Sequence, residues 1–258
     1  MNDLRLYPNQ ILESCGSTND LAKALAERGY PHGTWVSSRI QETGRGRLAR
    51  EWKSEAGNLF LSTLVQVENK SLWTWVPLTA AVAVVRCLSR KYPALHFEIK
   101  WPNDLYSNRQ KLGGILCESS GFNSYIIIGI GMNCTHSPRG LDQETTDLSQ
   151  ARGILTTADD VRADIHTSLL DEVAHLVHQG PIRVIGFYNQ WTSLRPGTEI
   201  SWRAIASTQI NPELQIGTVI GLGPSGELKV KTQDKIISIF SEDVKLHRAN
   251  EREPRRSE

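Results

Sequence analysis

The chain has 258 residues, of which 29 are Lys or Arg and 28 are Asp or Glu, so its formal net charge is +1. This near-neutral balance excludes the strongly basic field typical of a nucleic-acid-binding protein, and equally an acidic one. The most apolar stretch, residues 78–85, ends at Arg86, well short of the roughly 20 apolar residues of a membrane-spanning helix, and the N-terminus has no apolar signal core.

The first half of the chain predicts helices and strands without strict alternation. Ser17-Thr18-Asn19-Asp20 indicates a helix start, in which Ser17 or Thr18 would cap the free amides, and Gly29 would end the helix. Further elements are expected as strands at 33–40 and 59–67, a Gly- and Arg-rich loop at 41–52, and a helix at 77–90.

The middle of the chain predicts strands first and helices afterwards. A strand at 96–100 leads into a Trp-Pro-Asn-Asp bend at 101–104. Strands at 111–118 and 125–130 would form a hairpin through residues 119–124. A long helix would run from Thr157 to about Gln179, and a second, short helix would end near Trp191. The pattern indicates an α+β fold, with a mixed sheet flanked by helices.

The C-terminal part predicts a second, all-β domain. Short strands are expected at 199–203, 217–222, 227–231 and 235–240, with a tight turn at 223–226. So many short strands in fewer than 60 residues are typical of a small barrel. We therefore divide the chain into a domain at 1–194, a barrel at 195–248 and a charged, disordered tail at 249–258.

The cysteines and histidines do not predict a metal centre. The four cysteines form no Cys-x-x-Cys pair and are expected to be buried free thiols in a reducing, cytoplasmic environment: Cys15, Cys87, Cys117 and Cys134. His175 and His178 are three residues apart on the predicted helix, a spacing better explained by an exposed helical face than by a metal pair.

A Gly- and Arg-rich segment is the first candidate for chemistry. Residues 44–52 contain Gly44, Arg45, Gly46, Arg47 and Arg50 without apolar periodicity. Glycine allows close approach to a ligand, and the guanidinium matches carboxylate or phosphate oxygens. The segment therefore suits a polyanion, although a solvated surface loop or an RNA-binding segment has the same composition. No P-loop motif is present in the sequence.

Three further motifs carry polar groups at the ends of predicted elements. Lys100 and Asp104 flank the bend, and Lys111 precedes a Gly-Gly pair, so a sheet edge would bring the two lysines and a Mg²⁺-binding carboxylate together. A buried Trp-Pro hairpin with surface lysines would look the same. Asn133 ends a Gly-Ile-Gly-Met-Asn run, as an adenine-reading amide or as a turn residue. Ser17-Thr18-Asn19 would bind a polar ligand, or only cap its helix.

Taken together and in this order, the motifs resemble the biotin–protein ligase family. They are Ser-Thr-Asn, Gln-x-x-Gly-Arg-Gly-Arg-x-x-Arg-x-Trp, Lys-Trp-Pro-Asn-Asp, Lys-Leu-x-Gly-Ile-Leu and Gly-x-Gly-x-Asn. The resemblance implies a monofunctional enzyme that activates biotin with ATP to biotinyl-5′-AMP and diphosphate and then transfers biotin to a lysine of a biotin carboxyl carrier domain. It also implies a fold related to class II aminoacyl-tRNA synthetases, followed by an SH3-like barrel.

The resemblance implies roles for particular residues. The residues expected at biotin are Ser17, Thr18, Asn19, Gln41, Gly44, Arg45, Gly46, Arg47, Lys111 and Gly114. Those expected at ATP or the adenylate are Arg47, Arg50, Trp52, Lys100, Asn103 and Asn133, with Asp104 on Mg²⁺ and Arg248 as a candidate phosphate contact. Lys111 and Arg47 would be the catalytic pair, which stabilises charge on the α-phosphoryl oxygens and orients the biotin carboxylate.

The sequence also departs from the family pattern. Leu48 and Ala49 stand where the family loop has another residue and a glycine, and Glu51 stands where a basic residue is usual. Because the Ser-Thr-Asn motif starts at residue 17, we expect no DNA-binding domain, no repressor activity and no nucleic-acid partner. The lack of a long apolar stretch predicts no membrane partner. We expect a monomer or a homodimer.

Two other functions stay under consideration. A lipoate or octanoate ligase would share the fold, but its Arg-Arg, Gly-Gly-Gly and His-Asp signature is absent from the sequence. A nucleic-acid-binding module would use the Gly-Arg segment and the barrel, but the net charge and the lack of aromatic residues interleaved in that segment argue against it.

Overall fold

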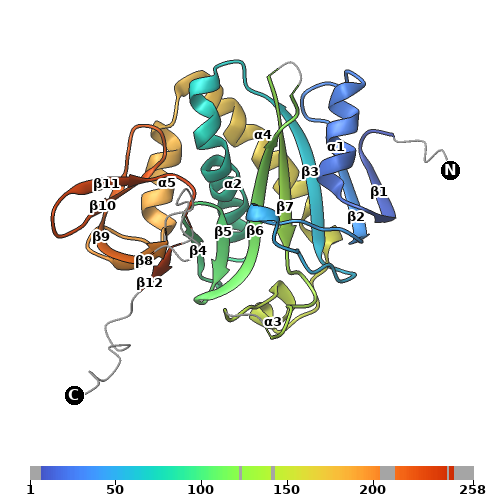
Figure 1. The fold of residues 1–258 in the computed structure, drawn as a ribbon. Helices are drawn as coiled ribbons and strands as arrows, with labels where there is room; N and C mark the ends of the chain where they lie inside the picture. Colours follow the sequence, from blue (N-terminus) through green and yellow to red (C-terminus); the bar gives the residue numbers. More distant parts are fainter. Residues whose placement is uncertain (1–6, 122–123, 141–142, 204–212, 243, 247–258) are drawn as a thin grey trace. The chain divides into compact units, whose positions relative to one another are not determined.

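The computed structural model describes residues 7–121, 124–140, 143–203, 213–242 and 244–246 (Figure 1). The chain divides into two compact units, residues 1–191 and 192–258. The sequence placed this boundary between residues 194 and 195. Arg248 and the expected tail at 249–258 lie outside the described residues.

A seven-stranded mixed sheet organises the first unit. The strands are β1 (Gln10–Cys15), β2 (Trp35–Gln41), β3 (Leu59–Gln66), β4 (Phe97–Lys100), β5 (Asp104–Ser107), β6 (Gln110–Ser119) and β7 (Tyr125–Met132). Their order is β1-β2-β3-β7-β6-β5-β4. The β1–β2 pair is parallel and the other neighbouring strands pair antiparallel. The predicted α+β class with a mixed sheet is confirmed, whereas β1 and β5 were not predicted.

Helices cover both faces of this sheet. The helices of this unit are α1 (Thr18–Glu27), α2 (Val76–Lys91), α3 (Leu148–Arg152), α4 (Arg162–Gln179) and α5 (Ile182–Trp191). Val36 of β2 packs in one apolar cluster with Leu25 of α1, whereas the hydroxyl of the next residue, Ser37, accepts a hydrogen bond from Arg162 of α4. Since successive strand residues point to opposite faces, α1 lies on one face and α4 on the other, together with α2, which packs against α4. Figure 1 shows α2 and α4 behind the strands.

Two helices differ from their predictions. The helix expected from Thr157 begins as a short 3₁₀ turn, Ala158–Asp160, closed by a capping box between Thr157 and Asp160, and α4 starts only after the non-helical Val161. A 3₁₀ turn also precedes α2, so residues 70–91 form one helical stretch, in which an 18-residue window has a mean hydropathy of 1.4. By length and composition alone this stretch would suffice to cross a membrane, contrary to our expectation, but 67% of its apolar window is buried inside the protein.

The second unit contains a five-stranded antiparallel sheet. Its strands are β8 (Glu199–Arg203), β9 (Leu214–Leu222), β10 (Leu228–Lys231), β11 (Ile236–Ile239) and β12 (Lys245–Leu246), in the order β11-β10-β9-β8-β12. The predicted turn joins β9 to β10, where the Gly223 amide donates to the Glu227 carbonyl at 2.7 Å. Four of these strands were predicted and β12 was not.

Candidate active site on the face of the sheet that carries α1

Glycines line the sheet where β6 and β7 pair, on the face that carries α1. Gly114 lies opposite Gly131 in the strand register, and Gly129 lies on the same face two residues earlier. A Cβ at Gly129 would collide with the Asn19 side chain, and a Cβ at Gly131 would lie 2.7 Å from Cε2 of Trp52. The glycines therefore let both side chains rest directly on the backbone. We call Gly114, Gly129 and Gly131 the glycine floor.

The N-terminus of α1 is capped in an unexpected way. Ser17 occupies the cap position but makes no capping bond with any described residue. Instead, Gln41 at the end of β2 accepts from the Thr18 amide at 2.8 Å and from the Thr18 hydroxyl at 3.0 Å through the same oxygen, Oε1. The expectation that Ser17 or Thr18 caps this helix is thus wrong, because a residue 23 positions away satisfies the amide. The contact brings two motifs of the predicted biotin site together.

Two residues absent from our prediction complete this polar cluster. Ser62 of β3 is fully buried, and its Oγ lies 2.7 Å from Thr18 Oγ1 and 2.6 Å from Asn19 Oδ1. Glu118 of β6 accepts from Asn19 Nδ2 at 2.5 Å. The available signal for Ser62 was a hydroxyl in the otherwise apolar start of strand 59–66, whereas Glu118 gave no signal beyond its charge.

The Gly- and Arg-rich segment folds into a small hairpin. The Trp52 amide donates to the Gly44 carbonyl at 2.9 Å, and the Gly46 amide donates to the Arg50 carbonyl at 2.7 Å. Leu48 at the tip has φ +56°, a left-handed conformation that costs a non-glycine residue about 1–2 kcal/mol. We call residues 44–52 the Arg hairpin. Figure 1 shows this part of the chain crossing in front of β6 and β7.

The arginines of the Arg hairpin point to different partners. Arg45 forms a two-pronged ion pair with Asp20 of α1, with Nη1–Oδ2 at 2.8 Å and Nη2–Oδ1 at 2.6 Å. This hydrogen-bonded pair lowers the pKa of Asp20 and raises the pKa of Arg45. Arg47 instead donates through Nη1 to Asn103 Oδ1 at 2.9 Å, while the Arg50 side chain is exposed. The segment thus contacts both α1 and the bend after β4.

Lys111 lies at the strand edge beside the predicted metal ligand. Its Nζ is 2.8 Å from Asp104 Oδ1 and 6.0 Å from the centre of the Trp52 ring. The two charged side chains are 18% and 21% exposed, so the pair is largely shielded from water. Lys100 lies opposite Asp104 in the register, with its ammonium 5.8 Å from the Tyr106 ring. Lys111, Asp104 and the Trp52 ring thus lie together at this end of β6, and Lys100 lies on the neighbouring strand β4, opposite Asp104.

The two predicted nucleotide-binding amides already have protein partners. Asn103 Nδ2 donates to the Ile115 carbonyl at 2.6 Å while its Oδ1 accepts from Arg47. Asn133 Nδ2 donates to the Thr146 carbonyl at 3.0 Å. Both residues are buried. They hold the bend after β4 and the segment before α3, and contact with adenosine stays a prediction.

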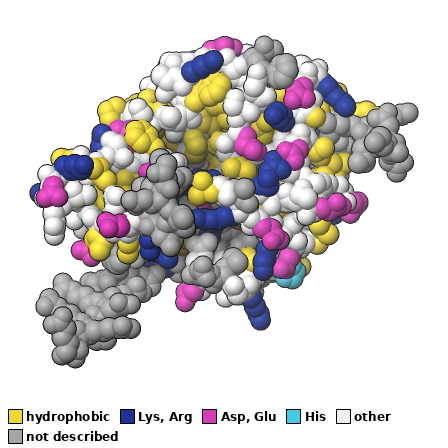
Figure 2. All heavy atoms as spheres, viewed as in Figure 1, with side chains coloured by type: hydrophobic (Ala, Val, Ile, Leu, Met, Phe, Trp, Pro, Cys, Tyr) yellow, Lys and Arg dark blue, Asp and Glu magenta, His cyan; other side chains and the backbone are white. Residues whose placement is uncertain are grey.

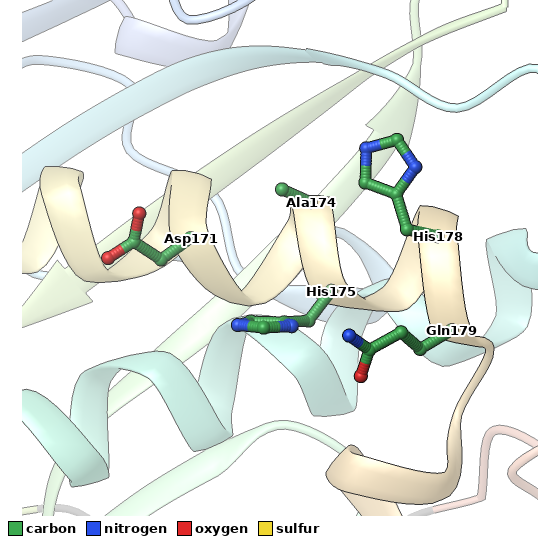
Figure 3. Close-up of a pocket in the computed structure, with 5 residues that line it drawn as sticks. All are labelled: Asp171, Ala174, His175, His178 and Gln179. Atoms are coloured by element: carbon green, nitrogen blue, oxygen red, sulfur yellow. The ribbon is translucent and has the colours of Figure 1, made fainter.

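The histidines and the surface charge add no second centre. Among the described residues, no group of three or more His, Cys, Asp or Glu side chains is placed to hold a metal. His175 and His178 on α4 point in different directions beside a surface hollow (Figure 3). On the face drawn in Figure 2, acidic and basic side chains are interspersed. All four cysteines are free, as expected, although Cys117 is only half-buried.

Comparisons with known proteins converge on one family. Residues 11–133 match the Biotin/lipoate A/B protein ligase family. The chain is 32% identical over 243 residues to the bifunctional ligase/repressor BirA of Bacillus subtilis, which covers 89% of this chain and 71% of that protein. It is 30% identical over 248 residues to the biotin–[acetyl-CoA-carboxylase] ligase of Mycobacterium tuberculosis, with 91% and 87% covered.

Solved structures give the same answer for the fold. The biotin protein ligase of Aquifex aeolicus in complex with biotin and ATP superposes with a TM-score of 0.78 at 24% identity, over 92% of this chain and 98% of that one. The biotin protein ligase of Leishmania major in complex with biotinyl-5-AMP superposes with a TM-score of 0.64 at 26% identity, over 90% and 98%.

Proposed function

Because the chain belongs to the biotin/lipoate A/B protein ligase family, we propose that it is a biotin–protein ligase. It activates biotin with ATP, forming biotinyl-5′-AMP and diphosphate, and then transfers biotin to a lysine of the carrier domain of a biotin-dependent carboxylase. The observation that carries the proposal is the convergence of Lys111, Arg45 and Arg47 around the glycine floor, next to the polar cluster at the start of α1.

The first half-reaction needs compensation of negative charge more than it needs a nucleophile from the protein. The biotin carboxylate attacks the α-phosphorus of ATP, and negative charge gathers on the phosphoryl oxygens. A cation already held in place stabilises that charge without reorganising. Lys111 is such a group, since its ammonium is fixed by Asp104 and largely shielded from water. Lys111 orients the carboxylate, and Arg47 faces the phosphates once it leaves Asn103.

The polar cluster suits the other end of biotin. The ureido ring carries one carbonyl acceptor and two N–H donors, so its site must offer both kinds of partner. Thr18, Asn19 and Gln41 carry hydroxyl and amide groups of both kinds within one hydrogen-bonded cluster. The glycine floor lies between this cluster and Lys111, so an acyl chain that took the place of the Trp52 ring there would lie against bare backbone.

Asp104 is the residue that would hold Mg²⁺. Mg²⁺ at nucleotide sites is commonly bound by one or two carboxylates together with phosphate oxygens. A single carboxylate beside Lys111 fits an ion that arrives with ATP, and not a cage built by the protein. When bound, the ion neutralises phosphate charge.

The wider context of the reaction follows from the same proposal. The catalytic unit would be related to class II aminoacyl-tRNA synthetases, and the five-stranded unit would be an SH3-like barrel. The near-zero net charge supports an enzyme without nucleic-acid partners, acting as a monomer or homodimer. The free cysteines support a cytoplasmic location.

The test is transfer of biotin to a protein acceptor. The purified protein is incubated with biotin, ATP, Mg²⁺ and the carrier domain of an acetyl-CoA carboxylase, and the carrier is analysed by mass spectrometry. We expect one biotin per carrier, with release of AMP and diphosphate. A parallel reaction with lipoate separates the two substrate classes of the family. Lipoate transfer without biotin transfer would overturn the proposal.

A further inference from the structure

Arg45 is held by two carboxylates from different elements. Asp20 in the first turn of α1 accepts two hydrogen bonds from its guanidinium, at 2.6 and 2.8 Å. Glu118 near the end of β6 lies 3.8 Å from the same guanidinium. A planar, two-pronged pair fixes orientation as well as distance. The base of the Arg hairpin is therefore tied to both α1 and the sheet.

Glu118 also sets the orientation of an amide in the proposed biotin site. Its Oε2 accepts from Asn19 Nδ2 at 2.5 Å, while its Oε1 faces Arg45. An ionised carboxylate only accepts hydrogen bonds, so the NH₂ end of the Asn19 amide must face Glu118. The oxygen end then faces Ser62, at 2.6 Å. One carboxylate thus links the amide of Asn19 to the first arginine of the hairpin.

We propose that Asp20 and Glu118 are positioning residues for biotin, an inference that rests on the proposed function. Together they form an acidic clamp that fixes the base of the Arg hairpin beside α1 and the NH₂ end of Asn19 toward the sheet. The tip of the hairpin, where Arg47 donates to Asn103, lies outside this clamp and is left to respond to ATP. Neither clamp residue is catalytic, because each acts through Arg45 or Asn19.

The alternative is that these are surface ion pairs of no consequence, and the chain supplies matched examples of such pairs. Glu13 pairs with Arg39 at 3.2 Å on β1 and β2, and Asp164 pairs with Lys91 at 2.6 Å between α4 and α2. Exposed pairs of this kind contribute about 0–1 kcal/mol to stability and have no reason to affect a distant site. Glu13→Gln and Asp164→Asn are therefore the controls.

The experiment compares Asp20→Asn and Glu118→Gln with these two controls. Isothermal titration calorimetry gives the Kd of biotin, steady-state assays give KM for biotin and for ATP, and hydrogen exchange reports on residues 42–52. We expect each clamp variant to raise the Kd and KM for biotin about tenfold, the loss of one charge-assisted hydrogen bond. The KM for ATP and the melting temperature should match the controls, while exchange at 42–52 becomes faster.

A double-mutant cycle identifies the route of the effect. If Asp20 acts through Arg45, Asp20→Asn adds nothing in an Arg45→Gln background. Additive losses, or clamp variants indistinguishable from the controls, would overturn the inference, as would an equal rise in both KM values together with a lower melting temperature. Failure of the proposed function looks different: the wild-type chain would not bind biotin, while the hydrogen-exchange comparison would still test the clamp.

Discussion

The decisive variant for the proposed chemistry is Lys111→Ala. Lys111 Nζ lies 2.8 Å from Asp104 Oδ1, and both side chains are about four-fifths shielded from water. Removing one charged group that stabilises a transition state in such a site costs about 3–4 kcal/mol, or 10²–10³ in rate. We expect adenylate formation to fall by this factor.

The same substitution leaves the Asp104 carboxylate without its cation. For an ion pair that is neither fully exposed nor fully buried, the loss of one partner costs about 1–2 kcal/mol of stability. For a protein of this size the melting temperature would fall by about 2–8 °C. Lys111→Ala combined with Asp104→Asn removes the stranded charge, so it should recover most of the stability and none of the rate.

The assay is single-turnover formation of biotinyl-5′-AMP, followed by chromatography after acid quenching. Lys91→Ala is the control, because it breaks a lysine–aspartate pair of similar length, 2.6 Å, between helices. This control should keep the wild-type rate. If Lys111→Ala formed adenylate as fast as Lys91→Ala, the assignment of Lys111 to the reacting carboxylate would have to be given up.

Three further predictions concern binding, the core and pH. Gly129→Ala places a methyl group against the Asn19 amide, and an overpacking cost of about 1–3 kcal/mol should weaken biotin binding by about 5- to 150-fold in calorimetry and leave ATP binding intact; unchanged biotin binding would contradict the glycine floor. Glu172 is fully buried and forms ion pairs with Arg86 and Arg183, so Glu172→Ala leaves both arginines without this carboxylate. Thermal unfolding should show a loss of about 3–5 kcal/mol of stability, and a loss below about 1 kcal/mol would be inconsistent with this. Burial lowers the pKa of His32, whose Nδ1 accepts from the Gln66 amide, so the unfolded chain takes up the proton more readily. Stability should be full above pH 6.5 and fall as the pH drops below it, and urea midpoints for His32→Asn should show a smaller slope, because burial lowers the pKa of His166 as well. A slope equal to that of the wild type would contradict the assignment to His32.

Local features of the fold were predictable because their signals are local. The Pro at the start of α2 and the basic residues in its last turn mark a helix that the structure places at 76–91, against 77–90 in the prediction. The two apolar strands that bracket residues 119–124 pair as an antiparallel hairpin. β1 was missed because its residues, Gln10–Cys15, alternate weakly and lie at the sheet edge.

The site was harder to predict because its contacts join distant parts of the chain. Motif order brought attention to Thr18, Gln41 and Lys111, but not to the residues that hold them. Asn19 and Glu118 are 99 positions apart and meet only through the strand order of the sheet. The prediction that Ser17 or Thr18 caps α1 failed for the same reason. Gln41 caps this helix from the end of the following strand, and no spacing rule connects that position with a helix start.

The glycine floor has a consequence for attempts to change the substrate. Glycine has no side chain to trim, so no replacement at positions 114, 129 or 131 can add space above the sheet, and every replacement takes space away. Variants that accept bulkier acids must therefore be sought at Trp52, whose ring lies over Gly114 and Gly131. A mutant library confined to these three glycines would return only variants with less space at this face of the sheet.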